Sequence, residues 1–129
     1  MKSIQYAWLV CRALFELARV DATYAMGGFA DIRRQLARYA VANATATREK
    51  ETMVCDAIAL ASALYWKPVR CLKRSVCAVR LLRRHGLAAQ LVIGYRPVPF
   101  LSHAWVEIDG RVVNDSPEYP KQLRVLLTT

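Results

Sequence analysis

Apolar residues recur every three or four positions through the first third of the chain, which is the spacing of one face of an α-helix. The first predicted helix covers residues 1–18, and the residues that form its apolar face are Tyr6, Leu9, Val10, Leu14 and Leu17. Met26-Gly27-Gly28 interrupts the pattern, because glycine weakens a helix interior. The helical spacing resumes over residues 29–41, so we predict two helical segments separated near the two glycines.

A polar stretch over residues 43–50 predicts a loop before the next helix. Thr47 or Thr52 is suited to cap that helix, because a threonine oxygen accepts a hydrogen bond from a backbone N–H group of the first turn. The helix is predicted over residues 53–66. Apolar residues cover so much of its circumference that we expect burial on most sides.

A last helix is predicted after Pro68, because proline fits the start of a helix and not its interior. This helix begins near Arg70 or Cys71 and continues to Arg84. The basic residues of its last turn and the glycine at position 86 form the expected stop signal.

Beyond residue 86 the helical spacing gives way to patterns typical of strands. We predict strands over residues 89–95, 102–108, 111–114 and 123–127. Asp109-Gly110 predicts a hairpin turn between the second and third strands. Helices first and strands second predict an α+β domain, in which N-terminal helices pack on a small antiparallel sheet.

The chain of 129 residues fits one domain, with a helical part over residues 1–66 and a part over residues 67–129 that combines one helix with the sheet. The hydrophobic content of 55% and the mean hydropathy of +0.15 exclude a disordered chain. No apolar run reaches the ~18 residues that a membrane span needs. Arg12 and Glu16 interrupt the one stretch that resembles a signal peptide, so we predict a cytoplasmic protein.

The net charge of +9 is unevenly distributed, because residues 57–106 contain no aspartate or glutamate. The basic residues of this stretch are Lys67, Arg70, Lys73, Arg74, Arg80, Arg83, Arg84 and Arg96. A basic face of this size would attract nucleic acid, an anionic membrane surface, an acidic peptide or an acidic protein. The alternative is a solvated helix face without a partner.

Four cysteines, at positions 11, 55, 71 and 77, are expected to be free thiols in a cytoplasmic protein. No two of them are separated by two to four residues, and only His85 and His103 could join them as ligands. We therefore predict no metal site and no cofactor.

Cys71 is the candidate nucleophile, because it lies in the predicted first turn of a helix. Unsatisfied backbone N–H groups at that position favour the reactive thiolate and can stabilise an oxyanion. Neighbouring Arg70, Lys73 and Arg74 act in the same direction. Cys77 lies about 240° further around the helix and cannot share the same pocket.

A cysteine nucleophile needs a base, which is usually a histidine held by an acceptor. His85 lies at a helix end beside two arginines, where a solvated cap is its expected role. His103 lies in a predicted strand between apolar neighbours, which indicates either a buried structural residue or a site. We therefore take His103 as the candidate base.

The acceptor that orients His103 depends on the length of the hairpin loop. If the loop is Ile108-Asp109-Gly110, counting outward places His103 opposite Asp115, with Cβ atoms ~5 Å apart on one face. With a two-residue loop the count shifts by one and Asp115 falls on the other face. Asn114 is then the alternative, because a Cys-His-Asn arrangement also works, and Asp109 is most simply a turn residue.

Several short segments occur in an order that is more specific than any of them alone. They are Cys71-Leu72-Lys73-Arg74-Ser75, Leu81-Leu82-Arg83-Arg84-His85-Gly86-Leu87, Leu91-Val92-Ile93-Gly94, Pro99-Phe100, His103-Ala104-Trp105-Val106-Glu107, Asp109-Gly110 and Val113-Asn114-Asp115. In this order they resemble the leader-peptidase family of lasso peptide biosynthesis, over just over a third of the chain. The resemblance implies a transglutaminase-like, papain-type fold with Cys71, His103 and Asp115 as the catalytic triad.

The resemblance also implies a substrate and partners. Members of the family cut the leader peptide from a ribosomally made precursor, and a separate ATP-dependent cyclase then closes a macrolactam. Longer members begin with a leader-recognition domain of mixed strands and helix, whereas the first 66 residues here are predicted to be helical. The chain therefore resembles the split form, in which a separate small protein recognises the leader.

Two other functions are compatible with the same residues. Amide transfer to an amine would use the same triad as hydrolysis, and a non-catalytic basic adaptor would need no triad. The sequence has no helix-turn-helix, zinc-finger or aromatic stacking motif, so we predict no nucleic-acid partner. For the peptidase, Trp105 and Arg74 are candidate substrate-binding residues, and a buried core position is the alternative for Trp105.

Overall fold

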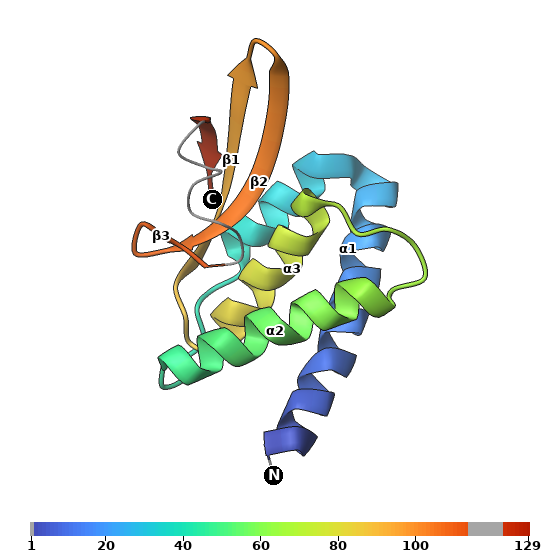
Figure 1. Ribbon diagram of the computed structural model, residues 1–129, viewed down its shortest axis with the longest axis vertical. Helices are drawn as coiled ribbons and strands as arrows, with labels where there is room; N and C mark the ends of the chain where they lie inside the picture. Colours follow the sequence, from blue (N-terminus) through green and yellow to red (C-terminus); the bar gives the residue numbers. More distant parts are fainter. Residues whose placement is uncertain (1, 114–122) are drawn as a thin grey trace.

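The computed structural model describes residues 2–113 and 123–129. Its elements are α1 (Lys2–Arg38), α2 (Arg48–Leu64), α3 (Cys71–Arg84), β1 (Ala89–Pro97), β2 (Phe100–Ile108), β3 (Arg111–Val112) and β4 (Arg124–Thr128). The strands form one antiparallel sheet in the order β3-β2-β1-β4, and the helices lie on one side of it (Figure 1), which confirms the predicted α+β fold. Within this part of the chain, no helix combines the length and apolar character needed to cross a membrane.

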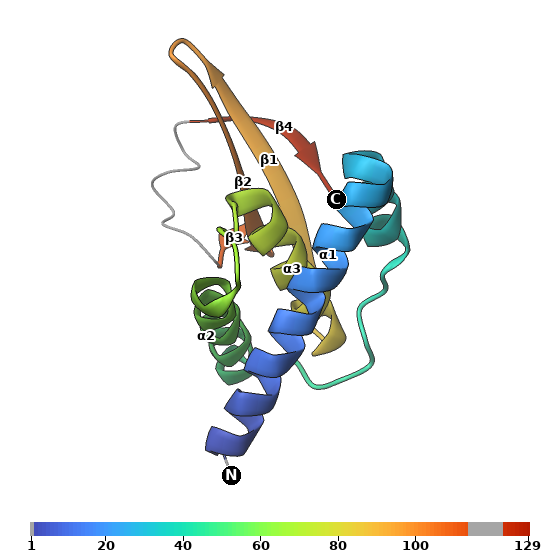
Figure 2. The ribbon, with the colours of Figure 1, turned by 90° about the vertical axis from the view of Figure 1, so that its right-hand side faces the viewer.

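Helix α3 occupies the centre of the molecule. It contacts α1 and α2 on one side and strands β1 and β2 on the other (Figures 1 and 2). Its apolar residues, including Val76, Val79 and Leu82, are almost completely buried. Because α3 begins at Cys71, this central packing also determines where the candidate nucleophile lies.

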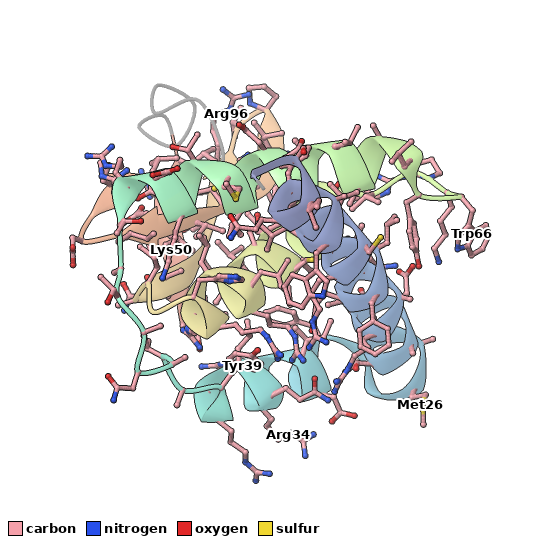
Figure 3. All side chains as sticks on the ribbon, turned by 90° about the horizontal axis from the view of Figure 1, so that it is seen from below. Met26, Arg34, Tyr39, Lys50, Trp66 and Arg96 are labelled. Carbon is pink, nitrogen blue, oxygen red and sulfur yellow. The ribbon has the colours of Figure 1, made fainter. Side chains whose placement is uncertain are left out.

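The two helical segments predicted at the N-terminus form α1, which bends at the predicted glycines (Figure 1). Gly28 has φ 68° and ψ −162°, a backbone conformation that is essentially restricted to glycine. Beyond the bend, Ile32 and Leu36 pack into the same core as the first part of α1. Met26 beside the bend and Trp66 after α2 point away from the helices in the view from below (Figure 3).

Helix α2 begins at Arg48, five residues earlier than predicted. Thr47 is its N-cap, and the side-chain oxygen accepts a hydrogen bond from the backbone N–H of Lys50 at 3.1 Å. Of the two threonines considered, Thr47 is therefore the cap and Thr52 is not. The charged first turn carries no apolar periodicity, which is why the hydrophobic pattern placed the start too late.

The two faces of the sheet pack against different clusters. Ala104 belongs to the main core beneath the helices, whereas Trp105 lies on the opposite face with Val92 and Leu123. Successive residues of a strand point to opposite faces, so His103 shares the face of Trp105.

The turn between β2 and β3 contains two residues, Asp109 and Gly110, and not the three that placed His103 opposite Asp115. Both turn residues have positive φ, 53° and 77°, which is the turn type that matches the twist of paired strands. The three-residue count is therefore wrong by one position. Asp109 is a turn residue, as predicted.

The predicted basic face is largely engaged within the chain. Arg80 pairs with buried Glu16 at 2.7 Å, and Arg83 donates to main-chain carbonyl oxygens. Lys67 and Lys73 both pair with one aspartate of α1. Arg96 Nε also donates to the Pro99 carbonyl oxygen at 3.2 Å, so at least five of the eight basic residues have intramolecular partners. A partner for this basic stretch stays a prediction.

Candidate active site

Cys71 is half-buried and is the first residue of α3, as predicted. The N-cap residue, Arg70, has an extended backbone (φ −82°, ψ 166°) and makes no side-chain capping hydrogen bond. The first turn of α3 contains no acidic residue. The positive end of the helix therefore lies at Cys71 without a carboxylate or a capping oxygen from its own turn, so its first-turn N–H groups are available to an anion.

The other cysteines have different surroundings. Burial, assisted by the carboxylate of Glu51, raises the pKa of the Cys55 thiol to about 11. Burial also raises the pKa of the Cys77 thiol well above its ordinary value, and this thiol donates to the Ala13 carbonyl oxygen at 3.7 Å. Both thiols therefore remain protonated at neutral pH. Cys11 is exposed on α1.

His103 lies in β2 opposite Gly94 of β1 and is half-buried. Its ring stacks with that of Trp105, with centroids 6.2 Å apart and an interplanar angle of 22°. A Cβ atom at position 94 would come within 2.7 Å of the Trp105 ring. Gly94 is therefore required for the close packing of this layer, which holds the ring of His103 in place from one side.

A buried hydrogen bond joins α3 to β2 close to both candidate residues. Ser75 Oγ donates to the Ala104 carbonyl oxygen at 3.2 Å. Ser75 follows Cys71 by one helical turn, ~6 Å along the axis, and Ala104 follows His103 by one residue, ~3.4 Å. Because α3 and β2 run in the same direction (Figure 1), Cys71 and His103 lie on the same side of this bond.

The direction of the Ala104 carbonyl shows which part of the sheet α3 approaches. The backbone N–H of Val113 donates to the Val106 carbonyl oxygen at 3.0 Å, so this carbonyl points toward the β3 side of β2. Carbonyl groups two residues apart in a strand point the same way, so that of Ala104 does too. The start of α3 thus lies beside this edge of β2, the strand that carries His103 on the same face as Trp105.

Asp115 and its alternative, Asn114, lie outside the described residues. The two-residue turn removes the counting argument that favoured Asp115. The resemblance to the leader peptidases remains the support for assigning it a role.

The two candidate substrate-binding residues have contrasting positions. Trp105 is 1% exposed, and its indole N–H donates to Glu107 Oε2 at 2.7 Å, which fits the alternative of a core residue. Arg74 lies three residues after Cys71 on the same face of α3 and lines a cavity between α2 and α3.

The sequence pattern did not single out Asp21, which anchors the segment leading into α3. Tyr65 Oη donates to Asp21 at 2.6 Å, and the ammonium groups of Lys73 and Lys67 lie 2.6 Å and 3.3 Å from its carboxylate. Burial acts to raise the pKa of Asp21, but these three contacts together outweigh burial and lower it. The sequence did contain a feature that could have identified Asp21. It follows the buried Leu17 by four residues and so lies on the core side of α1, where a carboxylate requires a partner.

Comparison with known proteins agrees with this architecture. Residues 14–128 match the model of the transglutaminase-like superfamily, and the chain belongs to that superfamily. A related protein, the Microcin J25-processing protein McjB of Escherichia coli, is 45% identical over 56 residues, which are 43% of this chain and 27% of McjB. The chain thus matches about a quarter of the length of this relative. No solved structure matches the chain.

Proposed function

We propose that this chain is a cysteine peptidase that removes the leader peptide from a ribosomally made lasso peptide precursor. The observation that carries the proposal is the position of Cys71 at the uncapped start of α3, beside β2, the strand that carries His103. Membership of the transglutaminase-like superfamily supports the chemistry. The similarity to a microcin-processing protein supports a peptide precursor as the substrate.

In the proposed mechanism, the Cys71 thiolate attacks the carbonyl carbon of the last leader residue, and His103 holds the proton released from the thiol. The first-turn N–H groups of α3 stabilise the resulting oxyanion. The C–N bond then breaks, His103 gives its proton to the leaving amine, and the leader remains as a thioester. Water, deprotonated by His103, hydrolyses the thioester and restores the thiol, while Asp115 orients His103.

The proposal includes two protein partners. A separate leader-recognition protein brings the precursor to the peptidase, and an ATP-dependent cyclase uses the freed amino terminus to close the macrolactam. We propose that the reaction takes place in the cytoplasm. The mechanism uses side chains and water and requires no cofactor.

The test is to incubate the purified chain with the precursor and the leader-recognition protein and to follow cleavage by mass spectrometry. Cys71→Ala, His103→Ala and Asp115→Asn are compared with wild type. Cys77→Ala is the matched control, because Cys77 lies on the same helix and is buried away from the sheet edge.

We expect one peptide bond to be cut, with activity retained by wild type and Cys77→Ala alone. Equal cleavage by all variants would contradict the assigned triad. A product in which the leader carries an added amine in place of a carboxylate would identify amide transfer instead. Absence of cleavage by wild type with its partner present would refute the peptidase function.

A further inference from the structure

A cavity of about 410 Å³ lies between α2 and α3. The residues that line it include Asp56, Ile58 and Ala59 of α2, Arg74 and Ala78 of α3, and Val113. Arg74 and Ala78 lie on the face of α3 that begins with Cys71, because residues three, four and seven apart share a helix face. The cavity therefore begins about one helical turn from the candidate nucleophile.

Arg74 lines this cavity and carries a donor that has no acceptor among the described residues. Its Nε atom is buried and has no hydrogen-bond partner in residues 2–113 and 123–129. The corresponding atoms of Arg80 and Arg83 are satisfied, by Glu16 at 2.7 Å and by the Ala89 carbonyl oxygen at 2.8 Å. A buried N–H without an acceptor is costly, so its retention beside a cavity points to a ligand that supplies the acceptor.

The charges of the lining decide which kind of acceptor fits. Arg74 and Asp56 carry opposite charges, so together they leave the cavity close to neutral. A carboxylate ligand would be repelled by Asp56, whereas a neutral amide, carbonyl or hydroxyl oxygen would accept from Arg74 without that repulsion. Ile58, Ala59 and Ala78 add apolar walls, which suit a peptide segment better than an ion.

We propose that this cavity is a substrate subsite in which Arg74 donates a hydrogen bond to a neutral oxygen of the peptide near the cleaved bond. The inference rests on the proposed peptidase function and adds a specificity-determining residue to it. An extended peptide advances ~3.3 Å per residue, so the distance of one helical turn from Cys71 corresponds to one or two residues from the cut. The oxygen belongs either to a side chain or to the main chain of the substrate.

The test compares steady-state cleavage of the precursor, with the leader-recognition protein present, by wild type and two kinds of variant. Arg74→Met removes the donor, and Arg74→Lys keeps the positive charge without the Nε–H group. Ala59→Leu fills the cavity from an exposed position on α2. Ala63→Leu is the matched control, because Ala63 is exposed one turn further along α2 and is not part of the lining.

We expect both Arg74 variants and Ala59→Leu to lower kcat/KM by roughly 10- to 100-fold, mainly through KM, and Ala63→Leu to match wild type. Arg74→Met should unfold at the same urea concentration as wild type or a higher one, because Nε makes no hydrogen bond within residues 2–113 and 123–129. Recovery of activity by Arg74→Lys would show that Arg74 acts through its charge on the thiolate. That result would overturn the subsite.

Substrate variants distinguish the two sources of the oxygen. If the oxygen belongs to a side chain, an apolar replacement of that substrate residue lowers the kcat/KM of wild type but not that of Arg74→Met. If the oxygen belongs to the main chain, Arg74→Met lowers kcat/KM by the same factor with every peptide. Equal kcat/KM for wild type and Arg74→Met refutes the subsite and leaves the peptidase intact, whereas no cleavage by wild type refutes the proposed function and the subsite with it.

Discussion

Replacing Arg80 with methionine would leave the buried carboxylate of Glu16 without its main partner. Glu16 is 1% exposed, and Arg80 Nε lies 2.7 Å from its Oε2 atom. Removing one member of a buried ion pair costs about 3–5 kcal/mol, because the other charge remains buried without full compensation. Arg12 lies 3.2 Å from the same carboxylate and retains part of that compensation. We therefore expect Arg80→Met to lower the free energy of unfolding by about 3 kcal/mol.

The reverse change, Glu16→Leu, leaves Arg80 with weaker contacts. These are Gln35 Oε1 at 3.5 Å and the ring of Tyr39, whose centroid lies 4.8 Å from the guanidinium carbon. We expect a larger loss, about 4 kcal/mol. The double variant replaces both charges by apolar side chains, so its free energy of unfolding should lie within about 1 kcal/mol of the wild-type value.

Urea unfolding followed by circular dichroism gives the four free energies needed for a double-mutant cycle. If the double variant loses as much as the two single variants combined, Glu16 and Arg80 do not act as a pair. If Arg80→Met costs less than about 1 kcal/mol, the carboxylate is hydrated well enough to behave as a surface group, and the reasoning from burial is wrong.

Three further predictions test other parts of the molecule. Gly94→Ala should lower the free energy of unfolding by about 1–3 kcal/mol, because the added methyl group would lie 2.7 Å from the Trp105 ring. The same change should shift the tryptophan fluorescence emission, and unchanged emission would contradict this packing. Iodoacetamide should label Cys71 at neutral pH and leave Cys55 and Cys77, whose thiols have raised pKa values, unmodified in a peptide map; equal labelling of all three would contradict this difference in reactivity. Hydrogen bonds from Arg111 hold the pKa of Glu51 below its usual value, so their stabilisation is present above about pH 4.3 and is lost as pH falls through the lower, folded-state pKa. Glu51→Gln should therefore weaken the acid dependence of the urea midpoint, and an unchanged pH curve would rule out this contribution.

The start of α3 and the bend in α1 were open to prediction because their determinants are local. Pro68 and the residues after it marked the start of α3 at Cys71, and Gly28 marked the bend. Thr47 was one of two possible caps, and the choice between them required the hydrogen bond to the first turn of α2. Backbone preferences of a few neighbouring residues account for each of these features.

The hairpin register shows where local reasoning stops. Asp109-Gly110 is compatible with loops of two or three residues, and the two choices place different residues opposite His103. The structure adopts the two-residue turn, so the geometric support for Asp115 fails although the strands themselves were correctly predicted. A shift of one residue exchanges the two faces of a strand, and hydrophobic alternation near a short strand does not determine it.

The sequence by itself determined the order of helices and strands, the bend at Gly28, and the place of the candidate nucleophile at a helix start. The tertiary structure decided that Arg80 pairs with Glu16, 64 residues away, and that Ser75 binds the Ala104 carbonyl and so brings Cys71 beside β2. It also decided the burial of Trp105 and left the Nε donor of Arg74 without an acceptor in the part of the chain that the structure describes. The physical reason is range: dihedral preferences act between adjacent residues, whereas charge pairing, burial and the approach of a helix to a sheet edge exist only once distant segments have packed into one core.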